Sequence, residues 1–310
     1  MTIQIHPYGW FAAAICIWLN PITPTFLDHP ELTESSGVAV GSQKTWVLWS
    51  HNDSGDSARL FAFKEDGTRL GVAVDPQLTA RDWEDMCSFA YEDRHFLAVG
   101  DVGDNLSRRE SVNVHVFVEP DIKELSVAKP FVNQDAPSSV KLKRVLTLEI
   151  TYEHGPANCE GLAYDPLRKT FVLATKENFR CRLYEVPMPN LTGPSEKPKV
   201  KEVRAKQAQS LVLPLVTGID ISPTGTQIVF CTYGPGVLLT RENKSQPWSH
   251  KLGFEHASFA LPPRKQGESI CFTRDESQLL LTSEFAPCPL FQVDMPSAAA
   301  NPIPELKPEK

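Results

Sequence analysis

Hydroxyl and carboxyl side chains recur at one position of a repeated sequence pattern. The pattern places a small or acidic residue before an apolar run, a tight turn and a second β-branched or aromatic run. In chain order, that first position holds Ser36, Glu84, Glu160, Thr217 and Glu268. Three carboxylates brought together would repel one another unless a cation lay among them. Oxygen ligands without His or Cys suit Ca²⁺, which takes about 6–8 oxygens in irregular geometry.

We therefore expect these five residues to ligate a Ca²⁺ ion, with water completing its coordination shell. The alternative is structural. In that case the Glu side chains would accept hydrogen bonds from backbone amides of neighbouring repeats, and no metal would be needed.

A second set of polar residues follows the second apolar run of each repeat. Antiparallel neighbours would bring these residues to the end of the molecule where the first strands begin. The set consists of His51, Asn52, Asp53, Asp101, Asp104, Asn105, Lys176, Tyr233 and Glu284. Polar residues of several chemical types around a carboxylate ring indicate a binding pocket.

Within this pocket, His51, Asp53 or Asp101 would be the catalytic base that activates water. The substrate would contact the other six residues of the set, namely Asn52, Asp104, Asn105, Lys176, Tyr233 and Glu284. Lys176, with Arg108 and Arg109, could hold an anion. Turn chemistry alone accounts for Gly55 and Gly103, and a structural role stays open for each of the others.

The elements that must position these residues are short strands. Apolar or alternating runs are bounded by Gly, Pro, Asn and Asp, which predicts an all-β protein. The first repeat predicts strands at 37–40, 45–49, 59–63 and 71–74, and four antiparallel strands of this length describe a propeller blade. Later repeats add strands at 112–118, 141–150, 182–186, 210–213, 237–240, 258–261 and 290–293.

The last repeat ends before its fourth strand. Residues 24–28 precede a Pro-containing loop, as residues 258–261 do, so we expect them to supply this missing outer strand and to cover an exposed edge. The prediction is a five-bladed β-propeller over residues 21–296, with an insertion at 119–140. Residues 1–20 form an apolar leader, and the Pro- and charge-rich residues 297–310 form a disordered tail.

Bulk composition excludes some functions. The net charge of −7 and the isoelectric point near 5.7 argue against a nucleic-acid partner, which needs a basic face. None of the seven Cys lies in a C-x-x-C pair, so a zinc site is not expected. Except for Cys16, we expect the cysteines to be small buried core residues. We expect a monomer that binds a small anionic substrate.

The run WFAAAICIWL at 10–19 has the length of a signal peptide and is too short for a stable membrane span. No Lys or Arg precedes it, and no A-x-A cleavage pattern follows it. The run predicts export to the periplasm or the extracellular space. A mis-called start codon would instead leave the protein in the cytoplasm.

Several segments together resemble a widespread bacterial β-propeller family of unknown function. They are HNDSG at 51–55, DWED at 82–85, GDVGDN at 100–105, Glu-Pro at 119–120, CEGLAYDP at 159–166, VTGIDISPTG at 216–225 and QGESICFT at 266–273. This resemblance covers nearly the whole chain. It implies a fold and a bacterial origin, but no activity.

The hydroxyl–Glu–Glu–hydroxyl–Glu order is also similar to that of calcium-activated nucleotidases, the soluble apyrases. That similarity implies a five-bladed propeller with Ca²⁺ in its central cavity and hydrolysis of nucleoside di- and triphosphates. It places metal ligands at the ring residues named above and an acidic turn near the substrate at 51–55. This chain departs from the family at 174–178 and at 231–234, where the apyrases carry basic and Lys/Glu segments.

The function expected from the sequence is Ca²⁺-dependent hydrolysis of phosphoanhydride or phosphoester bonds. One alternative is a non-enzymatic propeller with a structural Ca²⁺ ion that binds a ligand or a protein. A weaker alternative is a lactonase or esterase, by analogy of fold. The sequence contains no G-x-S-x-G, P-loop or G-x-G-x-x-G pattern.

Overall fold

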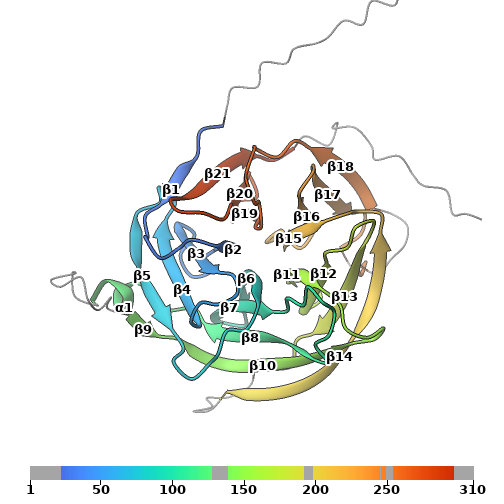
Figure 1. Ribbon diagram of the computed structural model, residues 1–310, viewed down its shortest axis with the longest axis horizontal. Coiled ribbons are helices and arrows are strands. Elements are labelled where there is room, and N and C mark those ends of the chain that lie inside the picture. Colours follow the sequence, from blue (N-terminus) through green and yellow to red (C-terminus); the bar gives the residue numbers. More distant parts are fainter. Residues whose placement is uncertain (1–21, 128–138, 192–197, 245, 249–253, 297–310) are drawn as a thin grey trace, which may run out of the picture.

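Strands arranged around one central axis make up almost all of the fold (Figure 1). The computed structural model describes residues 22–127, 139–191, 198–244, 246–248 and 254–296. The elements are β1 (Thr25–Leu27), β2 (Ser35–Val40), β3 (Val47–Asn52), β4 (Arg59–Lys64), β5 (Arg69–Val74), β6 (Trp83–Tyr91), β7 (Arg94–Asp101), β8 (Val112–Val118), α1 (Ile122–Val127), β9 (Ser139–Lys141), β10 (Lys143–Tyr152), β11 (Cys159–Asp165), β12 (Thr170–Thr175), β13 (Cys181–Pro187), β14 (Lys199–Leu211), β15 (Val216–Ile221), β16 (Gln227–Thr232), β17 (Gly236–Arg241), β18 (Phe254–Phe259), β19 (Cys271–Phe272), β20 (Gln278–Thr282) and β21 (Cys288–Asp294).

Consecutive strands pair antiparallel from the axis outward. The sheet orders are β2-β3-β4-β5-β9, β15-β16-β17-β18 and β19-β20-β21-β1. Two further units, β6-β7-β8-β10 and β11-β12-β13-β14, join into one eight-stranded sheet because their outer strands β10 and β14 pair in parallel. The all-β prediction is confirmed, and the radial arrangement of sheets is that of a β-propeller.

The innermost strands β2, β6, β11, β15 and β19 contact one another in that cyclic order, and β19 returns to β2 (Figure 1). Asp85, on β6, is completely buried at this centre. Its Oδ2 accepts hydrogen bonds from the backbone amides of Leu162 at 2.9 Å and Ile219 at 3.1 Å, and its Oδ1 accepts one from Met86 at 2.8 Å. One carboxylate therefore ties together the inner strands β6, β11 and β15.

Apolar side chains fill the space between neighbouring sheets. Phe89 stacks on Tyr164 with ring centroids 4.1 Å apart, and Phe171 packs edge-on against both. Cys87, Cys159, Cys181, Cys231, Cys271 and Cys288 are free and buried, as the sequence predicted. Cys16 lies outside the described residues.

Most predicted strands overlap observed ones, with differences at the outer positions. The strand predicted at 210–213 is only the end of β14, which begins at Lys199. Its first half is mostly charged and exposed, so it carries little strand signal. The insertion predicted at 119–140 contains α1 and β9, and β9 pairs in parallel with the outer strand β5.

The chain segment near the N-terminus pairs with the last strand. Thr25 is opposite Leu290, and Leu27 is opposite Cys288, in antiparallel register. The leader at 1–20 and the tail at 297–310 lie outside the described residues. Among the described residues, no helix has the length and apolar character needed to cross a membrane.

A second carboxylate, which is half-buried, lies farther along the axis. Asp220, on β15, accepts hydrogen bonds from the amides of Phe272 at 2.9 Å and Ile221 at 2.8 Å. Burial raises the pKa of Asp220 to about 7, although the Arg274 guanidinium acts in the opposite direction.

This pKa predicts a pH dependence of stability. In the unfolded chain an Asp titrates near about 4, so between about pH 4 and 7 only the native state holds the Asp220 proton. The free energy of unfolding should then fall as pH rises through this window, by at most about 1.4 kcal/mol per pH unit, and level off above about 7. Urea unfolding at several pH values should show a smaller fall for Asp220→Asn. The exposed substitution Asp93→Asn should keep the wild-type slope, and an unchanged slope in Asp220→Asn would contradict the assignment.

Candidate functional site

A β-bulge sets the direction of the ring side chains. In four inner strands the pairing register shifts by one residue, and the residue skipped in each case is the predicted ring residue. These residues are Ser36, Glu84, Glu160 and Thr217. A bulge leaves its extra residue out of the ladder and re-aims its side chain. Glu268 precedes β19, and all five ring residues are buried.

The structure divides the ring into two parts, and the first is organised around Lys176. Its ammonium donates to Glu160 Oε2 at 3.1 Å and to the Tyr233 hydroxyl at 3.2 Å, and it lies 3.8 Å from Glu268 Oε2. Tyr233 in turn donates to Glu268 Oε1 at 2.5 Å. Thr217 donates its hydroxyl proton to the carbonyl of Gly267 at 2.7 Å. The Lys176 ammonium therefore neutralises the negative charge of Glu160 and Glu268, which we expected a metal ion to neutralise.

This network shifts the pKa values of its members. Burial opposes the charge of Lys176, but Glu160 and Glu268 outweigh it and raise its pKa. Burial and the hydrogen bond to Glu268 raise the pKa of Tyr233 to about 12. Burial also raises the pKa of Glu160, against the attraction of Lys176. At neutral pH the ammonium stays charged and the phenol keeps its proton.

In the second part, the ring residue Glu84 lies beside two carboxylates from outside the ring. Asp53, Asp82 and Glu84 each offer an oxygen, and these oxygens lie within 4.8 Å of one another. Burial raises the pKa of Asp53 to about 7, and it also raises the pKa of Asp82. The pKa of Glu84 is raised well above its ordinary value, first by burial and then by Glu160, Asp53 and Asp82.

Glu84 is the most deeply buried member of this trio. Only 4% of the residue is exposed, and within the described part of the chain no hydrogen bond or ion pair reaches its carboxylate. Gly103 approaches so closely that a Cβ there would lie 2.2 Å from Glu84 Oε1. A buried carboxylate without a donor is costly, and a cation held between the three residues would remove that cost.

Two predicted catalytic residues lie elsewhere. His51 is completely buried; its Nε2 lies in space left by Gly37, and burial lowers its pKa to about 4. Asp101 is also buried and accepts from Arg109 Nη2 at 2.8 Å and from the Arg81 amide at 3.1 Å. Both side chains are engaged inside the fold, so Asp53 is the predicted catalytic residue that the structure brings to the acidic trio.

The predicted substrate-binding residues also separate into two groups. Asn52 is engaged by three hydrogen bonds to the loop before β2 and one to Asp56 in the loop after β3. Asp104 accepts from the Arg109 amide, and Asn105 accepts from Asn158. These residues shape the loops around the mouth of the channel.

Lys176, Tyr233 and Glu284 remain at the mouth itself. Glu284 is partly exposed, and burial followed by the charge of Glu268 raises its pKa. Arg108 is exposed, and Arg109 is occupied by Asp101. Roles for Ser36, Glu160, Thr217 and Glu268 as metal ligands stay predictions.

Sequence reasoning missed two residues of the site. Asp82 belongs to the DWED segment but lies two positions before the repeated position, so alignment of the repeats did not select it. Asn158 lies two residues before Glu160, donates to Glu160 Oε1 at 2.8 Å and accepts from the Asp104 amide at 2.8 Å. It thereby links Glu160 to the loop that follows β7.

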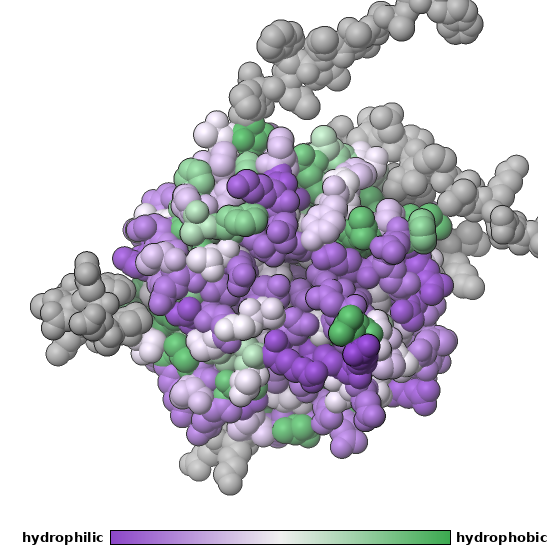
Figure 2. Space-filling model, in the orientation of Figure 1, coloured by the Kyte–Doolittle hydropathy of each residue, from purple (hydrophilic) through white to green (hydrophobic). Residues whose placement is uncertain are grey.

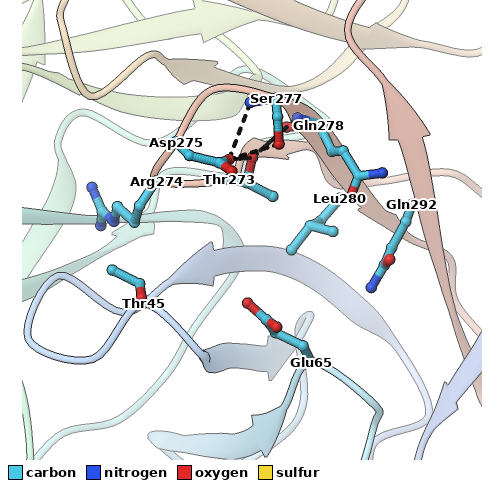
Figure 3. Close-up of a pocket in the computed structure, with 9 residues that line it drawn as sticks. All are labelled: Thr45, Glu65, Thr273, Arg274, Asp275, Ser277, Gln278, Leu280 and Gln292. Atoms are coloured by element: carbon cyan, nitrogen blue, oxygen red, sulfur yellow. Dashed lines mark hydrogen bonds between the residues drawn. The ribbon is translucent and has the colours of Figure 1, made fainter.

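A polar cavity of about 450 Å³ borders this mouth at Tyr233, between Gly234 and the segment Leu261–Gly267. A second cavity, of about 490 Å³, is lined by turns such as Thr273–Ser277 (Figure 3). Inner strands end at these turns, so this cavity lies at the opposite end of the channel. None of the predicted site residues lines that second cavity. The face seen along the axis is mostly hydrophilic around its centre (Figure 2).

Comparisons with known proteins support no functional assignment. No protein-family model and no curated protein matches the chain. It is similar to Kuenenia stuttgartiensis hydrazine synthase (9% identity, TM-score 0.38, covering 80% of this chain and 61% of that one). It is also similar to a chain of a nidogen/laminin complex (11% identity, TM-score 0.44, covering 83% of this chain and 74% of that one). A third similar structure is a proposed 6-phosphogluconolactonase of Bacteroides uniformis (10% identity, TM-score 0.38, covering 86% of this chain and 69% of that one). Because these identities and TM-scores are low, we assign the class of protein, an all-β propeller with an acidic channel mouth, from strand pairing and side-chain geometry.

The placement of Asp101 predicts a structural phenotype. Asp101→Ala should lower the free energy of unfolding by about 3 kcal/mol or more, because it leaves the buried Arg109 unpaired. The double variant Asp101→Ala/Arg109→Met should recover part of this loss, since both charges are then removed. Chemical denaturation measures both values. Full stability of Asp101→Ala would return Asp101 to the list of candidate catalytic groups.

Proposed function

We propose that this chain is a five-bladed β-propeller that binds a hard divalent cation, Ca²⁺ first, and hydrolyses phosphate-type bonds of a small anionic substrate at its channel mouth. The observation that carries the proposal is Glu84. It is a buried carboxylate to which no donor among the described residues is hydrogen-bonded, and it lies beside Asp53 and Asp82.

The strand pairing supports the count of five blades. Each innermost strand starts one antiparallel unit, and β1 supplies the outer strand of the unit formed by β19, β20 and β21. This closure covers the outer edge of β21. Export directed by the leader and a monomeric state remain part of the proposal.

The choice of cation follows from the donor atoms. Carboxylate oxygens without imidazole or thiolate favour hard ions such as Ca²⁺ and Mg²⁺. The trio offers donors from a loop after β3, a loop before β6 and β6 itself. Ligands from such loops are unevenly spaced. Ca²⁺ accepts uneven ligand spacing better than Mg²⁺, which requires octahedral geometry, so Ca²⁺ is the first candidate.

The mouth has the groups that phosphate hydrolysis requires. A bound divalent cation supplies positive charge for phosphate oxygens and lowers the pKa of a water molecule. Lys176 adds a positive charge on the other side of the ring, where Tyr233 donates its proton to Glu268. Glu284, partly exposed and with a raised pKa, can accept the proton of the attacking water.

The second candidate is a non-enzymatic propeller in which the cation stabilises the ring and the mouth binds a ligand. It is favoured by the engagement of His51 and Asp101 within the fold, which leaves fewer groups free for proton transfer.

Thermal unfolding tests the cation site. Ca²⁺ at about one hundred times its Kd should raise the melting temperature of the wild type by roughly 5 °C or more, because it binds only the native state. In Glu84→Gln this increase should disappear, while the surface substitution Glu124→Gln should retain it. Equal increases in all three proteins would remove Glu84 from the site.

A hydrolysis screen separates the two functions. With Ca²⁺ present, wild type should release phosphate from a panel of phosphoesters and phosphoanhydrides, and Glu284→Gln should lose at least about tenfold in kcat with an unchanged melting temperature. Ca²⁺-dependent stabilisation without turnover on any substrate of the panel would favour the binding propeller.

A further inference from the structure

Two buried carboxylates point toward one lysine at the axial side of the ring. Glu160 Oε2 lies 3.1 Å from Lys176 Nζ, and Glu268 Oε2 lies 3.8 Å from it. Each Glu is 4% exposed. The other oxygen of each carboxylate is held by a neutral donor, Asn158 for Glu160 and Tyr233 for Glu268. The free pair of oxygens is thus fixed in place around a single cation position.

Glu268 Oε2 shows that the ammonium fills this position incompletely. The atom is buried and makes no hydrogen bond within the described part of the chain, so its only favourable partner there is the charge of Lys176. Lys176 also interacts with the Tyr233 ring, 4.8 Å from its centroid. A lysine ammonium is a compact charge at the end of a flexible side chain. The Lys176 side chain reaches from the end of β12 to the ring.

We infer that the Lys176 ammonium occupies a second cation position, formed by Glu160 and Glu268, and that residue 176 therefore sets how many divalent ions the channel mouth binds. This inference rests on the proposed function only for the neighbouring cation position at Asp53, Asp82 and Glu84. The position at Lys176 is inferred from the contacts of Lys176 itself.

Charge explains why the two occupants exclude each other. An ammonium and a divalent ion between the same two carboxylates would repel each other at close range. Removal of the ammonium would leave two buried carboxylates facing each other, which must then take up a proton or a cation. The native chain thus holds one divalent ion beside a built-in positive charge that does not depend on metal supply.

Calorimetric titration of the full chain with Ca²⁺ tests this inference. The wild type should bind one ion, and Lys176→Met, which keeps the apolar stem, should bind two. Lys176→Arg should bind one because it keeps the charge. The double variant Lys176→Met/Glu268→Gln should return to one ion, since the new position then lacks a carboxylate.

The outcomes distinguish this inference from the proposed function. One ion in both the wild type and Lys176→Met, or two ions in the wild type, would overturn the role of Lys176 and leave the trio site standing. No ion in the wild type and one in Lys176→Met would support Lys176 and refute the trio site. No ion in either protein would refute both.

A folding defect would not obscure the result. If Lys176→Met is unfolded without metal, added Ca²⁺ should restore the circular dichroism spectrum of the wild type, because the ion replaces the missing charge. Failure of Ca²⁺ to restore it would also overturn the inference.

Discussion

The inner strands can meet at one axis only if the polar groups they carry there find partners. Asp85 meets part of this requirement, because its carboxylate accepts backbone amides from β6, β11 and β15. A buried amide without an acceptor would cost about 1–3 kcal/mol, and this one side chain satisfies donors of three inner strands at once. The relative placement of β6, β11 and β15, and hence of Glu84, Glu160 and Thr217, depends on this arrangement.

The same axis concentrates charge at its mouth. The bulges turn Glu84 and Glu160 inward, and Glu268 joins them from the segment before β19. This charge is compensated unevenly. Lys176 and Tyr233 pair with Glu160 and Glu268, whereas Glu84 lies beside two more carboxylates, Asp53 and Asp82. This asymmetry separates an ion network around Lys176 from the cation site that we propose at Glu84.

The repeats predicted much of the fold and less of the site. Periodicity located the inner strands and the pairing of residues near 25 with the last strand, because both carry strong apolar patterns. It failed at β14, whose first half is exposed and charged. It also predicted that residues following the second strands would face the channel. His51 and Asp101 instead belong to the ends of β3 and β7, and their side chains are buried in the protein interior. The role of Lys176 as counter-charge depends on contacts between distant segments, which no local spacing encodes.

A crystal structure grown with Ca²⁺, with the ion located by its anomalous scattering, tests the central claim most directly. The account predicts an ion about 2.3–2.6 Å from carboxylate oxygens of Asp53, Asp82 and Glu84, with Lys176 still bound to Glu160. An ion on the axis between Glu160 and Glu268 with Lys176 displaced, or no ion at the mouth at saturating Ca²⁺, would contradict it.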